Sequence, residues 1–170
     1  ENRKDHGLIF DRTVRDNITL TVLEKLANVL GFIRKGKQAE LSRGFVSSLN
    51  IKCPDDLTPV DTLSGGNQQK IVLAKWLACR GAIIILDEPT RGIDVGAKQE
   101  IYLQMNRLCE EGKAVVLISS DLPELLSMSD RIYVMRLGRI VRELDAAKTS
   151  QQEVLYHASL GEGHPHAETG

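Results

Sequence analysis

Two short apolar runs separated by one helical stretch most constrain the fold of this 170-residue chain. Residues 82–86 read Ala-Ile-Ile-Ile-Leu and residues 114–118 read Ala-Val-Val-Leu-Ile, without the polar alternation of a half-exposed strand. Such runs are typical of strands buried on both faces of a parallel sheet. Between them, helical spacing predicts a helix over about 96–111 that ends at Gly112. The side chains expected to face inward are Ile101, Met105, Leu108 and Cys109.

The first half of the chain has helical rather than strand periodicity. Apolar residues recur at helical spacing from about 20 to 50, with a basic break at 34–37, and a further helix is predicted over about 66–79. Strand and helix then alternate, which indicates an α/β layer architecture preceded by a helical insertion.

We therefore expect a helical subdomain over about 10–80 and an α/β core portion over about 81–160. Within the core portion, two short runs at 132–135 and 140–141 predict a hairpin, and a helix is expected near 151–160. Residues 161–170 read as a flexible tail.

Composition narrows the class of protein without giving a function. The 22 basic and 23 acidic residues leave a net charge of -1, so no strong field favours nucleic acid. The apolar runs are too short to cross a bilayer, and because no basic segment precedes an apolar stretch we expect no secretion signal. Three widely spaced cysteines indicate reduced thiols in the cytosol. Because the chain opens on Glu1 without a Met, we expect it to be a piece of a longer protein.

An acidic pair, Asp87 and Glu88, follows the first apolar run and precedes Pro89 and Thr90. A nucleotide hydrolase needs one carboxylate for magnesium and a second one to orient the attacking water. Neighbouring strand residues point to opposite sides, so the two carboxylates could divide these tasks at the edge where α/β folds bind ligands. The alternative is a strand end capped by solvated acids.

The second candidate site is the octapeptide 63–70, Leu-Ser-Gly-Gly-Asn-Gln-Gln-Lys. Ser64 is a favourable N-cap, and Gly65 and Gly66 remove Cβ atoms from the first helical turn. Backbone amides at a helix start, together with the helix dipole, can bind phosphate. An ordinary glycine-containing loop and cap is the alternative interpretation.

Several motifs in order resemble those of the ABC ATPases. The octapeptide looks like their signature motif, residues 83–90 resemble the Walker B strand, and residues 92–94 resemble the D-loop. The Asn67 variant and the 87–94 segment are similar to the second cassette of ribose/galactose-type sugar importers. The resemblance implies part of a P-loop NTPase cassette, an α/β fold with a mainly parallel sheet core and a helical signature subdomain.

The resemblance also implies roles for individual residues. Asp87 would hold Mg²⁺ through water, and Glu88 would be the second catalytic carboxylate. Residues that would contact ATP are Ser64, Gly65, Gly66, Asn67, Gln68, Asp94, Ser120 and Glu1. In the family the signature completes the nucleotide site of a partner cassette, so the octapeptide would act in trans.

The chain departs from the family pattern in three places. No GxxxxGK[ST] phosphate loop occurs in the sequence, so we expect that motif upstream. Ser120 stands where the family has its switch histidine, and Glu1 occupies the position of the Q-loop glutamine. These changes imply that the nucleotide site built on Asp87 is catalytically weak.

The implied protein is an ATPase subunit that energises carbohydrate import. Its expected partners are a second cassette, in the N-terminal half of the same polypeptide, and membrane permease subunits, with a sugar-binding protein acting indirectly. It would lie in the cytoplasm, peripheral on the inner face of the membrane, without nucleic acid. The alternatives are a chromosome- or repair-type ABC ATPase and a catalytically degenerate regulatory cassette. The first would need long coiled coils, and the sequence has no heptads.

Overall fold

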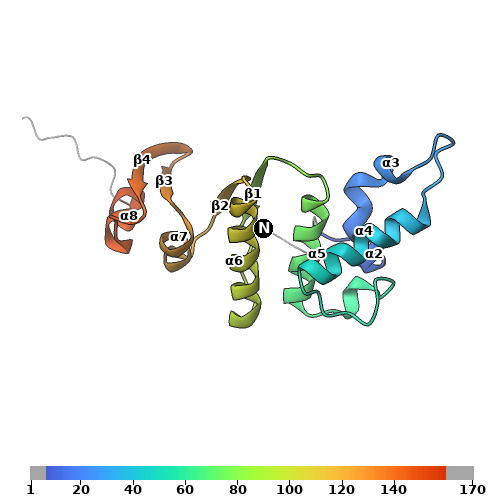
Figure 1. The fold of residues 1–170 in the computed structure, drawn as a ribbon. Helices are drawn as coiled ribbons and strands as arrows, with labels where there is room; N and C mark the ends of the chain where they lie inside the picture. The colour runs from blue at the N-terminus through green and yellow to red at the C-terminus, as the bar shows by residue number, and fades with distance from the viewer. Residues whose placement is uncertain (1–6, 160–170) are drawn as a thin grey trace, which may run out of the picture. The chain divides into compact units, whose positions relative to one another are not determined.

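The computed structural model describes residues 7–159 (Figure 1). Its contacts divide the chain into two compact units, with the boundary in the sequence between Val116 and Leu117. The expected boundary near residue 81 lies inside the first unit. Each unit has its own cluster of buried apolar side chains.

Between residues 7 and 77, the first unit has six helical elements. In chain order they are α2 (Val14–Thr19), η1 (Leu20–Val22), α3 (Leu23–Leu26), α4 (Lys35–Ser48), η2 (Val60–Thr62) and α5 (Gly65–Leu77). The predicted helix over 66–79 corresponds to α5 and is confirmed. The predicted basic break at 34–37 is wrong in part, because Lys35 already opens α4 and the real interruption is the loop between α3 and α4.

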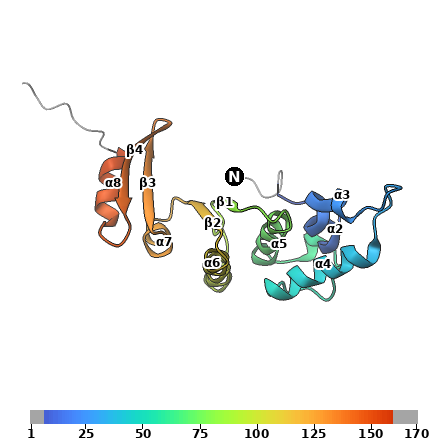
Figure 2. The ribbon, with the colours of Figure 1, turned by 45° about the horizontal axis from the view of Figure 1, so that its top comes forward.

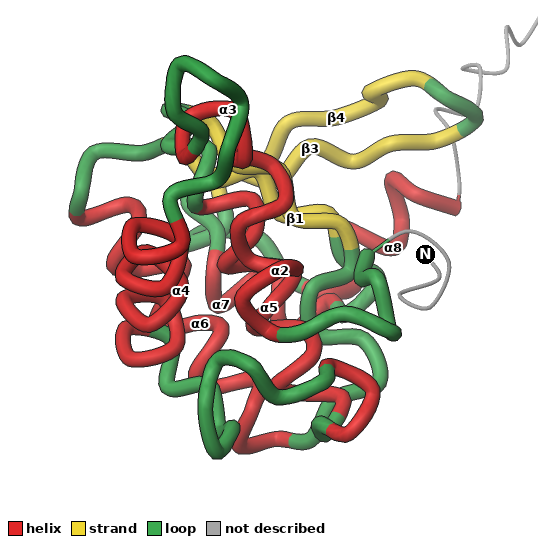
Figure 3. The backbone as a smooth tube through the Cα atoms, turned by 90° about the vertical axis from the view of Figure 1, so that its right-hand side faces the viewer, coloured by secondary structure: helices red, strands yellow, loops and turns green. Residues whose placement is uncertain are grey.

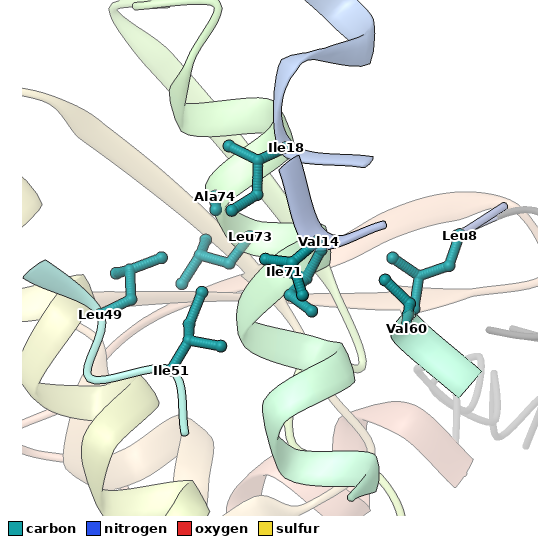
Figure 4. Packing of buried hydrophobic residues seen from close by; sticks show 9 residues of the cluster. All are labelled: Leu8, Val14, Ile18, Leu49, Ile51, Val60, Ile71, Leu73 and Ala74. Carbon is teal, nitrogen blue, oxygen red and sulfur yellow. The ribbon is translucent and has the colours of Figure 1, made fainter. Parts of the chain in front are cut away.

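Helix α5 forms the centre of the first core. Its buried Ile71 and Ala74 pack among residues contributed by α2, by the chain that follows α4, and by η2 (Figure 4). Ile18 and Ile71 are both fully buried, and each contributes about 1.5–3 kcal/mol relative to an exposed side chain. The residues of this cluster are Leu8, Val14, Ile18, Leu49, Ile51, Val60, Ile71, Leu73 and Ala74.

An ion pair connects α2 to the loop that leads toward α5. The Arg15 guanidinium donates two hydrogen bonds of 2.8 Å to the carboxylate of Asp56, whose side chain is 2% exposed. The backbone N–H of Arg15 also donates to the backbone carbonyl of Asp56, at 2.8 Å. A bidentate pair of this kind fixes orientation as well as distance. The hydrogen bonds from the Arg15 side chain are the main cause that holds the pKa of Asp56 below its usual value, and the positive charge of Arg15 adds to this effect.

Strands β1 (Ile83–Asp87) and β2 (Ala114–Ile118) form a parallel pair joined by helix α6 (Val95–Glu110). This confirms the predicted strand–helix–strand unit. Figures 1 and 2 show α6 along one side of the pair. The expected burial on both faces is wrong for the described residues: Ile84 is 8% exposed, but Ile83 and Ile85 are each 66% exposed. Only one face has a layer packed against it, so alternate residues remain open.

Helix α6 shows a narrower buried face than its sequence suggests. Ile101, Met105 and Leu108 are buried as predicted, whereas Cys109 is exposed and that part of the prediction is wrong. The buried positions follow a spacing of four and three residues. Position 109 falls at the edge of this stripe, beyond the side chains that the stripe packs against.

The second unit contains α7 (Leu122–Met128), β3 (Arg131–Arg136), β4 (Arg139–Asp145) and α8 (Gln151–Ser159). The predicted hairpin is confirmed: β3 and β4 are antiparallel and joined by Leu137 and Gly138, both with positive φ (Figure 3). Asp121 caps α7 by accepting a hydrogen bond from the backbone N–H of Glu124. The buried cluster of this unit is Ile132, Val134, Leu144, Ala146 and Val154.

We expect Asp56→Asn to destabilise the chain by about 3 kcal/mol, because it leaves Arg15 beside a neutral amide in a buried site. Asp61→Asn, at an exposed carboxylate in η2, is the matched control and should change stability by less than about 0.5 kcal/mol. Urea unfolding at pH 7 measures both.

The same pair predicts a pH dependence. Because the folded-state pKa of Asp56 lies below its unfolded value, the pair stabilises the fold fully above about pH 3.9. Its contribution is lost as the pH falls through the lower, folded-state pKa. The difference in unfolding free energy between wild type and Asp56→Asn should therefore shrink in that acid range, and a constant difference would contradict the assignment.

Candidate functional site

The hydroxyl of Ser64 lies at the start of α5 and is oriented by Asn67. The Asn67 side-chain oxygen accepts the backbone N–H of Lys52 at 2.8 Å, and its amide nitrogen donates to Ser64 Oγ at 3.0 Å. A backbone N–H can only donate, so the first bond fixes which end of the amide faces Ser64. Ser64 Oγ therefore accepts from Asn67.

This arrangement leaves the Ser64 proton for another acceptor. Ser64 is the N-cap residue of α5, but its side chain accepts no capping hydrogen bond from the helix. Since the hydroxyl has one proton and Asn67 uses an acceptor site, Ser64 can donate outward from its exposed position. A phosphate oxygen is the kind of acceptor that such a hydroxyl at a helix N-terminus binds.

Gly66 is required by helix packing. It is buried, and a Cβ built on it would lie 2.8 Å from Ala97 Cβ on α6. That distance is shorter than side-chain carbons tolerate. The two glycines of the octapeptide thus differ: Gly65 is exposed at the helix start, whereas Gly66 allows α5 and α6 to approach each other.

An open pocket of about 220 Å³ lies where α5 meets the start of α6. It brings together four of the predicted site residues: Ser64, Gly66, Asn67 and Asp94. Lys70, the last residue of the octapeptide, also lines the pocket but had no predicted contact with ATP. The lining residues outside the predicted motif residues are Lys52, Gly96, Ala97 and Glu100. Lys70 and Glu100 each lie four residues after a glycine of their own helix, so helical spacing from Gly66 and Gly96 could have found them. Lys52 carries no comparable local signal.

Two of the charged lining residues neutralise each other. Lys70, 4% exposed, forms an ion pair with Glu100 and donates to the Asn50 carbonyl at 2.8 Å. The amide of Asn50 also donates to Glu100 at 3.1 Å. The hydrogen bond from Lys70 is the main cause that lowers the pKa of Glu100. Glu100 is therefore ionised at neutral pH and balances the buried lysine.

Asp94 combines a structural task with its place in the pocket. One carboxylate oxygen accepts the backbone N–H of Ala97 at 2.9 Å and so caps α6. The other oxygen would lie 3.6 Å from a Cβ built on Gly66. Asp94 and the start of α5 are thus neighbours within the first unit.

Asp87 and Glu88 lie at the end of β1, as predicted, but not as successive strand residues. Asp87 is the last residue of the strand and is exposed. Glu88 has left the strand with φ of +47°, the left-handed region that non-glycine residues seldom adopt. A turn follows, in which the Arg91 N–H donates to the Glu88 carbonyl at 3.2 Å. The side-chain alternation of a strand therefore does not continue through Glu88.

The remaining predicted site residues do not line the pocket. The side chain of Gln68 donates to the carbonyls of Val60 and Leu63, which holds α5 against the preceding segment. Ser120 lies in a bend beyond β2, in the second unit. Glu1 lies outside the described residues.

Within residues 7–159, no three His, Cys, Asp or Glu side chains gather in a way that could hold a metal ion. Asp87 offers one exposed carboxylate, which suits Mg²⁺ held by one or two protein oxygens and by substrate phosphates. No helix among these residues is long and apolar enough to cross a membrane.

The family profile described as ABC transporter matches residues 2–91, which is 90 of the 170 residues. The chain therefore belongs to the ABC transporter family, and it is an ATP-binding cassette sequence. This confirms the resemblance to ABC ATPases inferred from the motifs, while the assignment to the second cassette stays a prediction.

The chain is similar to the ribose import ATP-binding protein RbsA of Oceanobacillus iheyensis, with 48% identity over 164 residues, 96% of this chain and 33% of that protein. RbsA of Bacillus subtilis is 47% identical over 161 residues, 95% of this chain and 32% of that protein. The chain thus spans about one third of the length of these relatives.

Among solved structures, the fold is similar to a dimeric ATP-binding cassette in a post-hydrolysis state bound to ADP and Pi. The TM-score is 0.70 at 24% identity, over 82% of this chain and 59% of that one. A dimeric bacterial ABC transporter cassette matches with the same values. These likenesses confirm the predicted P-loop NTPase fold class.

Gly66→Ala should destabilise the chain by about 1–3 kcal/mol, because the new methyl group overlaps Ala97. Gly44→Ala on α4 is the matched control: its Cβ meets nothing within 4 Å, so it should stabilise the chain by about 0.5–1 kcal/mol. Thermal and urea unfolding measure both changes.

A double-mutant cycle separates the overlap from other effects. Gly66→Ala should cost clearly less in an Ala97→Gly background, where the opposing methyl group is gone. An equal cost in both backgrounds would show that the two helices do not approach at this point.

Proposed function

We propose that this chain forms part of the ATP-hydrolysing subunit of a carbohydrate importer. The observation that carries the proposal is the Ser64 hydroxyl, set by Asn67 as a donor at the start of α5 and beside Asp94. Membership of the ABC transporter family and the similarity to ribose import ATP-binding proteins support it.

In this proposal the octapeptide acts on the ATP bound mainly by a partner cassette. Ser64 donates its proton to a terminal phosphate oxygen, and the exposed Gly65 allows the phosphate to approach the backbone. Gly66 contributes indirectly, since it lets α6 hold Asp94 against the signature helix. Asn67 keeps the hydroxyl oriented before the ligand arrives, which avoids a reorganisation cost.

The acidic pair belongs to a second, weaker nucleotide site. Asp87 would hold Mg²⁺ through water, and Glu88 would orient or deprotonate the attacking water. Bound Mg²⁺ would supply charge neutralisation for the phosphates. Ser120 has no imidazole to contact the γ-phosphate, and Glu1 replaces an amide with a carboxylate. Both substitutions favour nucleotide binding over turnover at this site.

The remaining parts of the proposal concern the assembly. The partner cassette is the N-terminal half of the same polypeptide, consistent with relatives about three times the length of this chain. The two cassettes act on membrane permease subunits at the cytoplasmic face, and a sugar-binding protein delivers the substrate from the other side.

The two sites should respond differently to substitution in a full-length protein that carries this chain. We expect Gly65→Asp to abolish transport-coupled ATPase activity, because a carboxylate then stands where phosphate should bind. Glu88→Gln should reduce the activity less, since it affects the weaker site. The measurement is the steady-state ATPase rate of the reconstituted transporter.

Leu57→Asp, at an exposed loop position away from the pocket, is the control and should leave the ATPase rate unchanged. Equal losses from Gly65→Asp and Glu88→Gln would overturn the asymmetry. Wild-type activity in Gly65→Asp would overturn the proposed role of the octapeptide itself.

A further inference from the structure

The loop between α3 and α4 exposes a group of large apolar side chains. Val29 is 99% exposed, Leu30 76% and Phe32 70%, and Ile33 is also exposed. Four apolar residues within five positions form the apolar tip, defined here as residues 29–33. Scattered exposed apolar residues are ordinary, but a contiguous group marks a surface that is covered by something else.

The apolar tip is held in a defined conformation. Asn28 organises it: its side-chain oxygen accepts the N–H groups of Leu30 and Phe32 at 2.9 and 3.0 Å. Its backbone carbonyl accepts from Gly31 at 2.9 Å, and its N–H donates to the carbonyl of Phe32 at 2.9 Å. Gly31 has φ of +82°, which closes the turn without strain. The apolar side chains are therefore presented by a rigid turn.

Basic side chains follow the apolar tip at once. Arg34, Lys35 and Lys37 are all exposed, where the loop enters α4. The acidic residues nearest in sequence are Glu24 and Glu40, so residues 24–40 carry four basic groups, including Lys25, against two acidic ones. This local excess contrasts with the net charge of -1 for the whole chain.

Figures 1 and 2 show this loop projecting beyond α3 and α4. A projecting apolar turn beside a basic cluster matches the chemistry of a bilayer surface, where apolar side chains enter the acyl boundary and lysine or arginine meets anionic headgroups. A protein partner would need a matching apolar groove with acidic edges. The lipid surface needs no such shape, and its charge complements the basic cluster directly.

We propose that the apolar tip and the three basic residues after it form a contact with an anionic membrane surface. This contact involves neither ATP nor a permease. It adds to the proposed function a direct attachment of this chain to the membrane. If the experiment below shows no membrane binding, the proposed ATPase role is unaffected.

The test is co-sedimentation of the 170-residue chain with vesicles of phosphatidylglycerol and phosphatidylcholine, compared with phosphatidylcholine alone. The chain should bind the anionic vesicles, with binding that weakens as salt rises. Phe32→Asp should weaken it roughly tenfold or more, since the side chain no longer enters the acyl boundary. Lys35→Gln combined with Lys37→Gln should remove most of the dependence on anionic lipid.

Leu57→Asp is the matched control, because Leu57 is 53% exposed in a loop and directly follows two acidic residues, Asp55 and Asp56, in the sequence. It should bind like wild type. A second measurement uses Phe32→Trp in a Trp76→Phe background, since Trp76 is the only tryptophan. Its emission should shift to shorter wavelength with anionic vesicles and not with neutral ones.

Three outcomes would overturn the proposal. The first is no binding to anionic vesicles, or equal binding to both kinds. The second is an equal effect of Phe32→Asp and Leu57→Asp. The third is binding that appears only when the vesicles contain permease subunits, which would make the apolar tip a protein contact.

Discussion

The absence of one Cβ atom, at Gly66, is the constraint on which the candidate site depends. It lets α5 lie so close to α6 that Ala97 would touch any side chain at that position. Helix α5 contributes Ile71 and Ala74 to the main core of the first unit, while α6 is continuous with the β1–β2 layer. The contact therefore joins the helical segments to the strand layer. Ser64 and Asp94 become neighbours as a consequence.

Much of this architecture could be predicted from sequence, because its signals are local. The β-branched runs, the glycines that end helices and the spacing along α6 each depend on nearby residues, and the corresponding elements are present. The exposure of Ile83 and Ile85 could not be predicted in the same way. A continuous apolar run shows that both faces of a strand are suited to burial, but whether each face is buried depends on whether another layer of the structure packs against it.

Of the residues that line the candidate site, only those within the sequence motifs could be predicted. Nothing local connects Lys52 to Asn67, which are brought together by the path of the chain between α4 and α5. Nor does sequence distinguish the exposed Gly65 from the buried Gly66, although one can face a ligand and the other faces a methyl group. The direction of the hydrogen bond to Ser64 likewise follows from a backbone donor 12 positions away, at Lys52.

The backbone at Glu88 has a consequence for the evolution and engineering of this segment. A left-handed conformation costs a non-glycine residue about 1 kcal/mol, and glycine would adopt it freely. Selection for thermal stability alone would thus drive this position toward glycine and discard the carboxylate. A glutamate retained in such a conformation keeps a carboxylate at this position at the cost of about 1 kcal/mol of stability. The residue found here in related sequences therefore records whether stability or the carboxylate has been selected.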